Sequence, residues 1–306
     1  MIAITGATGH LGRLVIAALL DQNVPASEIV AIVRDAGKAA DLAARGVQVR
    51  QADYAQPDTL TAALRGVDKL LFVSSSEVGS RARAAQHRNV VDAAREAGVT
   101  LLAYTSIPKA DTSPMLLAAE HKATEEMIRA AGLPFVFLRN GWYMENYTDN
   151  LAPTLQHGAL LGSAGEGRFT PATRADYAAA AAAVLTGQGH ENAVYELGGD
   201  ESVSLAGLAA EIGTQSGTPV TYRNLPAVEY AHALTGFGLP AGLATVLADA
   251  DLGIARGDLT TESGDLRRLI GRPTITLADA VRAGLSAALA TAVGQSSHER
   301  APENGE

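Results

Sequence analysis

Residues 2–20 read IAITGATGHLGRLVIAALL, an apolar run that gives way to glycines and then to a helical pattern. The glycines stand at every third position, as Gly6, Gly9 and Gly12, and apolar residues recur at helical spacing from Leu11 to Leu19. A glycine-rich turn that joins a strand to a helix is typical of phosphate binding, because the backbone can approach the ligand and the helix N-terminus offers free N–H groups. We expect Gly6 to permit the turn, Gly9 to admit a pyrophosphate and Gly12 to let the helix pack on the strand. An ordinary glycine turn is the alternative.

The rest of the first half alternates between strand and helix patterns. Further short apolar runs, typical of strands buried on both faces, occupy residues 28–33, 47–51, 69–74, 101–105 and 134–138. Helical patterns lie between them, and one of these begins with Ser113–Pro114 and stops at Gly132, which are common boundary residues. This alternation predicts an α/β fold with a doubly wound parallel sheet of the Rossmann type.

The second half predicts a smaller lobe. We expect residues 1–150 to form the dinucleotide-binding domain, with 190–200 returning to the sheet as a late strand, and 151–290 to form a mainly helical substrate lobe. Thr173 and Asp176 fit a capping box at the start of an alanine-rich helix. The polar tail, 291–306, is expected to be disordered.

Composition narrows the classes of function. The chain has 306 residues, a net charge of -9 and no cysteine. The acidic charge argues against nucleic-acid binding, and the lack of cysteine excludes disulfides and thiolate metal sites. The sequence shows no targeting segment and no apolar run of the length of about 20 residues that a membrane span needs. We therefore expect a soluble, cytoplasmic protein.

The end of the second strand bears on the choice of nucleotide. NAD-binding proteins usually place an acidic residue there, for the ribose 2′-hydroxyl. Arg34 takes this place, with Lys38 nearby. A guanidinium favours the 2′-phosphate of NADPH through charge-assisted hydrogen bonds. The alternative is a solvated Arg34 with Asp35 serving the ribose.

Three other junctions are candidate ligand sites. Asp53 follows the third strand and is expected near the adenine, and Ser74–Ser75–Ser76 follow the fourth, near the ribose, unless they serve only the loop. Asn140 lies in the segment that follows the sixth strand and is placed to bind the nicotinamide carboxamide or a substrate carbonyl. Beyond it, Trp142, Tyr143 and Tyr147 predict a flat aromatic wall, of which Tyr143 is the favoured residue. Interdomain packing is the alternative for these rings.

The usual catalytic dyad of this fold is missing. Reductases of this type carry Tyr-x-x-x-Lys on the helix after the fifth strand, where the tyrosine supplies a proton. Aligning Glu125 with the acidic residue that often follows the lysine puts His121 in the lysine's place and Leu117 in the tyrosine's. His121 is then either a catalytic group or a partly buried structural histidine. The histidines show no metal-ligand spacing, and the chain holds no G-x-S-x-G motif.

Several segments together resemble a known family. MIAITGATGHLG, VPASEIVAIVRDAGKA, LLFVSSSEVG, AEHKATEEMI, LRNGWYMENY and TRADYAAAAAAVL occur in an order, from residue 1 to about 290, that is similar to the NmrA-like atypical short-chain dehydrogenases. Within that family the chain most resembles bacterial NAD(P)H:quinone oxidoreductases that work without zinc or flavin. The resemblance implies NADPH in the cleft and substrate between the sheet and the lobe. The cofactor residues it implies, with those from the turn, are Gly6, Ala7, Thr8, Gly9, His10, Leu11, Gly12, Arg34, Ser74, Ser75, Ser76, Gly141, Trp142, Tyr143, Met144, Glu145, Asn146 and Arg174.

The missing tyrosine restricts the acceptor. Reducing a ketone builds alkoxide charge and needs a positioned acid, whereas hydride addition to a quinone gives an anion stabilised by aromatisation. We expect two-electron hydride transfer from NADPH to a quinone, without flavin or metal, with Asn140, Tyr143 or His121 steadying the oxygen. Two alternatives are a redox-sensing regulator of the NmrA type without turnover and a reductase of another delocalised acceptor, such as triphenylmethane dyes. A homodimer is possible.

Overall fold

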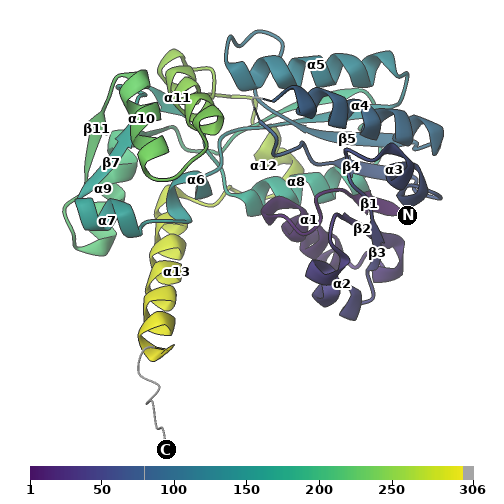
Figure 1. Ribbon diagram of the computed structural model, residues 1–306, viewed down its shortest axis with the longest axis horizontal. Coiled ribbons are helices and arrows are strands. Elements are labelled where there is room, and N and C mark those ends of the chain that lie inside the picture. The colour runs from purple at the N-terminus through teal and green to yellow at the C-terminus, as the bar shows by residue number, and fades with distance from the viewer. Residues whose placement is uncertain (79, 299–306) are drawn as a thin grey trace, which may run out of the picture.

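The computed structural model describes residues 1–78 and 80–298, and its centre is a seven-stranded parallel sheet (Figure 1). The strand order is β3-β2-β1-β4-β5-β6-β9, and each neighbouring pair runs parallel. The strands are β1 (Ile2–Ile4), β2 (Ile29–Val33), β3 (Gln48–Gln51), β4 (Lys69–Phe72), β5 (Leu101–Ser106), β6 (Phe135–Asn140) and β9 (Ala193–Leu197). The predicted doubly wound Rossmann-type fold is confirmed, and its strand order reverses between β1 and β4.

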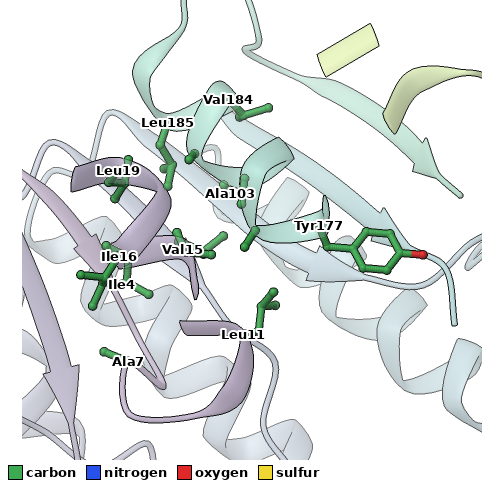
Figure 2. Close-up of a cluster of buried hydrophobic side chains, with 14 of the residues drawn as sticks. Ile4, Ala7, Leu11, Val15, Ile16, Leu19, Ala103, Tyr177, Val184 and Leu185 are labelled. Atoms are coloured by element: carbon green, nitrogen blue, oxygen red, sulfur yellow. The ribbon is translucent and has the colours of Figure 1, made fainter. Parts of the chain in front are cut away.

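Alternate residues of the strands pack into separate hydrophobic cores on the two faces of the sheet. On β1, Ile4 packs with α1 (His10–Asp21) and α8 (Arg174–Thr186), while Ala3 packs on the opposite face. That face is covered by α3 (Pro57–Ala63), α4 (Arg81–Glu96) and α5 (Leu116–Ala130). Figure 2 shows the first core, to which α1 contributes Leu11 and Val15 and α8 contributes Tyr177, Val184 and Leu185. Burial on both faces explains why the strands read as continuous apolar runs.

Helix α8 lies on the sheet, although the expected boundary at residue 151 assigned it to the lobe. Most of its side chains from Tyr177 to Leu185 are buried against α1 and the strands. Thr173 caps α8 by accepting the N–H of Asp176 at 3.2 Å. The Asp176 carboxylate accepts from the Thr173 hydroxyl, from Arg272 and from the N–H of Ile275. Asp176, the acidic residue of the predicted capping box, therefore holds the distant segment from Arg272 to Ile275.

The lobe contains short strands as well as the predicted helices. Strands β7 (Ala159–Gly162) and β11 (Thr221–Asn224) pair in parallel, and β8 (Arg168–Phe169) pairs with β10 (Val203–Ser204). The remaining helical elements complete the chain: η1 (Ala26–Glu28), η2 (Ala36–Ala39), α2 (Ala40–Ala44), α6 (Glu145–Thr148), α7 (Ala152–His157), α9 (Leu205–Ser216), α10 (Ala227–Gly236), α11 (Ala241–Arg256), α12 (Asp265–Ile270) and α13 (Leu277–His298).

Two predicted boundaries differ from the structure. Helix α5 begins at Leu116 instead of Ser113–Pro114, because the carboxylate of Asp249 in α11 accepts the N–H of Leu116 at 2.7 Å. A tertiary contact thus replaces the local serine cap. Residues 291–298, expected in a disordered tail, continue α13, which runs away from the lobe (Figure 1), and 299–306 lie outside the described residues. Within residues 1–78 and 80–298, no helix combines the length and apolar character required to span a bilayer.

Candidate active site

The glycine turn brings the start of α1 directly against the end of β1. Gly6 has a φ of +58°, a conformation that favours glycine, and its carbonyl accepts the N–H of Gly9 at 2.9 Å. A Cβ at Gly12 would lie 2.4 Å from the Gly6 oxygen and 2.8 Å from the Ala7 Cα. Only glycine therefore lets the first helical turn close on this loop, and the N-terminus of α1 points over it.

A cavity of about 370 Å³ opens beside this turn, at the carboxyl ends of β1, β2, β3 and β4. It lies where the strand order reverses, the position at which open α/β sheets bind ligands. The cavity is lined by Gly6, Thr8, Gly9, Ile32, Val33, Arg34, Lys38, Ala52, Asp53, Tyr54, Val73, Ser74, Ser75, Ser76, Glu77 and Gln86. Eight predicted cofactor residues thus meet in one cavity: Gly6, Thr8, Gly9, Arg34, Asp53, Ser74, Ser75 and Ser76.

The other predicted residues of the glycine turn lie beside this lining. The side chains of Ala7 and Leu11 are buried in the core between α1 and the sheet, so these two residues offer a ligand only their backbone. His10 is exposed at the start of α1.

Two basic side chains belong to the lining of the cavity. Arg34 and Lys38 both line the cavity, and both are exposed. Asp35 accepts the N–H of Gly37 at 2.9 Å and so caps the 3-10 turn η2. Arg13 of α1 holds the same segment by donating to the carbonyl of Lys38 at 2.6 Å. Arg34 lines the cavity, whereas Asp35 is engaged in the turn and does not appear in the lining.

Besides Lys38, seven cavity residues were not predicted as ligands: Ile32, Val33, Ala52, Tyr54, Val73, Glu77 and Gln86. The Tyr54 hydroxyl donates to the Val73 carbonyl at 2.8 Å and contacts Thr5, tying the ends of β1, β3 and β4 together. Tyr54 directly follows the predicted Asp53, and Val73 lies at the end of the predicted strand 69–74, so the position of the strand ends was a signal for both residues. Gln86 comes from α4, and only tertiary packing brings it here. Asp53, whose carboxylate accepts the N–H of Ala55 at 2.8 Å, also shapes its own turn.

A second group of predicted residues follows β6, away from this cavity lining. Gly141 donates its N–H to the Leu197 carbonyl at 2.8 Å, and Met144 donates to Ala172 at 3.0 Å. These bonds hold residues 141–146 between the sheet and the segment before α8. The structure joins Arg174 to this group, because its N–H donates to Glu145 Oε1 at 2.8 Å.

The predicted aromatic wall is divided between two cores. The Tyr143 ring lies 5.3 Å from the Arg174 guanidinium and 5.4 Å from the Tyr177 ring, next to the sheet. Trp142 is buried in the lobe core, and Tyr147 packs against the same core. Interdomain packing, the alternative weighed for these rings, describes Trp142 and Tyr147. The contacts of Tyr143 leave its predicted role in ligand binding a prediction.

Buried polar atoms near Tyr143 have spare hydrogen-bonding capacity. Asn140 is 5% exposed, and within the described residues its Oδ1 has no hydrogen-bond partner, nor has Glu145 Oε2. Such atoms are rare in folded proteins and are costly unless a ligand or water satisfies them. Burial raises the pKa of Tyr143, against the opposing effects of Asn140 and Arg174, and burial also raises the pKa of Glu145. Asn140 Oδ1 and Glu145 Oε2 are therefore candidate contacts for a ligand or water.

His121 is buried with both ring nitrogens engaged. Its Nε2 lies 3.3 Å from Nη2 of Arg83, and its Nδ1 lies 2.8 Å from the Tyr104 hydroxyl. Because arginine only donates, Nε2 accepts and Nδ1 carries the proton. Burial, and then the Arg83 charge, hold the pKa of His121 well below 6.5. This neutral ring fits the structural alternative, and the prediction that it steadies a substrate oxygen gains no support from its contacts.

Glu125 lies one turn after His121 on α5 and binds Arg139 instead of the histidine. Its carboxylate accepts from Arg139 at 2.9 and 2.8 Å and from the Ser106 hydroxyl at 2.7 Å. It therefore joins α5 to β5 and β6, as a helix support.

Comparison with known proteins agrees with this geometry. Residues 6–188 match the family described as NAD(P)H-binding, and the chain belongs to that family. It is 56% identical to Quinone oxidoreductase 2 of Escherichia coli (strain K12) over 281 residues, which cover 92% of this chain and 97% of that protein.

Two solved structures have the same fold over nearly the whole chain. The NADPH-dependent quinone oxidoreductase from Escherichia coli in complex with NADPH has a TM-score of 0.88 at 55% identity, covering 92% of this chain and 99% of that one. The triphenylmethane reductase of Citrobacter sp. in complex with NADP(H) has a TM-score of 0.88 at 41% identity, covering 93% and 100%. The predicted resemblance to NAD(P)H-dependent reductases of this kind is confirmed.

Proposed function

We propose that the protein reduces quinones with NADPH by direct two-electron hydride transfer, without flavin or metal. The observation that carries the proposal is the cavity at the carboxyl ends of β1 to β4, which has a helix N-terminus on one side and Arg34 with Lys38 on another. The similarity to a protein named as a quinone oxidoreductase supports the choice of acceptor.

The residues of the cavity fit NADPH as a ligand. The Gly6–Gly9 turn and the first N–H groups of α1 suit the pyrophosphate. Arg34 and Lys38 suit the 2′-phosphate, since both are exposed cations that line the cavity, whose acidic lining residues are Asp53 and Glu77. Ser74, Ser75 and Ser76 suit the ribose of the other nucleotide. The spare Oδ1 of Asn140 suits a carboxamide N–H of the nicotinamide.

The overall reaction consumes one quinone, one NADPH and one proton and yields hydroquinone and NADP⁺. Bound NADPH supplies the hydride. The chain orients the acceptor with Tyr143 and stabilises the developing oxygen charge by hydrogen bonds from the side-chain amide of Asn140 or the hydroxyl of Tyr143. Because the reduced quinone is a stabilised anion, water can deliver the last proton. The buried, neutral His121 has no part in this proton transfer.

Consumption of NADPH by the purified protein tests the proposal. Several quinones are supplied without added flavin, in the presence of a metal chelator, and hydroquinone is measured. Turnover at equal rates with and without chelator supports the proposal. Saturable NADPH binding without oxidation by any quinone would overturn it in favour of a redox-sensing regulator. Oxidation only by a triphenylmethane dye would change the acceptor class.

Other properties of the chain stay predictions. Cytoplasmic location, a homodimer and the lack of nucleic-acid binding are proposed from the sequence alone. The described residues hold no group of three or more His, Asp or Glu side chains placed to bind a metal ion.

A further inference from the structure

Ser75, which lines the cofactor cavity, is held by side chains of α4. Arg83 Nη1 donates to the Ser75 carbonyl at 2.5 Å, and the Ser75 N–H donates to His87 Nε2 at 2.9 Å. The Ser75 hydroxyl donates to Gln86 Oε1 at 2.5 Å. Positions 83, 86 and 87 share one face of a helix. Three side chains from the first two turns of α4 thus fix both backbone polar groups and the hydroxyl of one cavity residue.

A second layer of side chains fixes Arg83 and His87. His87 Nδ1 lies 2.8 Å from Thr124 Oγ1, and Arg83 Nη2 lies 3.3 Å from His121 Nε2. Arg83 Nε also lies 3.2 Å from the Glu120 carboxylate. Thr124, His121 and Glu120 all belong to α5, so this helix supports α4 from the side away from the cavity.

We propose that Arg83 and His87 are positioning residues that hold Ser75 and its loop in the shape required to bind the nicotinamide nucleotide. The inference rests on the proposed binding of NADPH in this cavity. It also gives His121, in the place of the missing lysine, a function: this residue acts on the cofactor site through Arg83.

Burial shows why this arrangement is specific. Arg83 is 2% exposed and His87 is fully buried, between the rings of Phe72 and Tyr104 at 4.9 and 5.8 Å. A buried guanidinium is costly to desolvate. Apolar side chains of the same helix, such as Val90, are buried in the core without this cost. The hydrogen bonds of Arg83 and His87 to Ser75 and to α5 favour one geometry, because a shift would break bonds between buried polar groups.

Donor and acceptor roles in the network define a matched pair of variants. Ser75 donates to His87 Nε2, so Nε2 is unprotonated and the proton on Nδ1 is donated to Thr124. Glutamine can reproduce both bonds, with its carbonyl oxygen accepting and its amide donating. Leucine fills a similar volume and makes neither bond. His87→Gln and His87→Leu therefore separate the hydrogen bonds from simple packing.

The experiment measures dissociation constants for NADPH and NADH by fluorescence titration. Each variant's unfolding free energy is measured in parallel, and only folded protein is titrated. We expect His87→Leu and Arg83→Met to raise both dissociation constants about tenfold, by equal factors, because the loop lies away from the 2′-phosphate. His87→Gln should stay within about threefold of the wild type. Arg88→Met removes an exposed charge from the same helix and should leave binding unchanged.

Thr124→Val keeps the proposal testable where the larger changes prevent folding. The substitution preserves shape on α5, outside the cavity lining, and removes the partner of His87 Nδ1. We expect it to raise both dissociation constants about threefold. Wild-type affinity in folded Thr124→Val and His87→Leu would overturn the inference. If the wild type itself binds neither nucleotide, the proposed function fails first, and the two failures are distinguishable.

Discussion

Acidification is expected to destabilise the protein through His87, because its pKa falls from an ordinary value of 6.5 to about 3 on folding. Burial is the larger cause, and the Arg83 charge adds to it. Below pH 6.5 the unfolded chain takes up a proton here that the folded chain excludes. The stability contributed by neutral His87 is therefore complete above pH 6.5 and is lost as the pH falls toward 3.

The size of this loss of unfolding free energy follows from the one extra proton that the unfolded chain binds as the pH falls. One pKa unit corresponds to about 1.4 kcal/mol, so between pH 6.5 and about pH 5 His87 lowers the unfolding free energy by about 2 kcal/mol. His121, whose pKa is also lowered, acts in the same direction. Asp251 acts in the opposite direction, because burial raises its pKa from 3.8 to about 6 and the folded chain takes up that proton first. A single variant must therefore isolate His87.

Urea denaturation of the wild type and of His87→Gln, from about pH 7.5 to about pH 5, isolates this contribution. Above pH 6.5 the difference in unfolding free energy between the two proteins should be constant. Below it, the difference should shift in favour of the variant by about 1.4 kcal/mol per pH unit. An Asp251→Asn background should leave this slope unchanged, since the two sites lie in separate parts of the fold. Parallel stability curves over the whole range would refute the reasoning.

Three further predictions concern the cofactor and the acceptor. Arg34→Ala should weaken NADPH about tenfold to a hundredfold, the range for lost charge-assisted hydrogen bonds, and leave NADH nearly unchanged in the same titration; equal losses would contradict the phosphate assignment. Tyr143→Ala and Asn140→Ala should each lower quinone turnover at least tenfold while retaining most of the NADPH affinity, and unchanged steady-state rates would remove both residues from the acceptor site. Gly12→Ala should lower the unfolding free energy by about 1–3 kcal/mol and weaken both nucleotides, because its Cβ would meet the Gly6 oxygen at 2.4 Å; a variant with wild-type thermal stability and affinity would show that the turn can relax.

The sequence determined the features that depend on neighbours along the chain. Alternating apolar runs and helical patterns defined the parallel sheet, because each strand and helix is specified locally. Glycines at positions 6 and 12 meet conformational and contact demands within one turn, so their spacing was informative. Residues after the first four strands met in one cavity, since parallel strands end at the same edge.

Tertiary structure decided what each polar side chain does. Asp249 caps α5 in place of Ser113, and Asp176 binds a segment near residue 275. His121 holds Arg83, and Glu125 holds Arg139, although spacing alone placed the two together on one helix face. Helical spacing shows which side chains share a face, but the element packed against that face chooses their partners. Hydrogen bonds between distant segments form only once packing has excluded water, and so no local pattern records them.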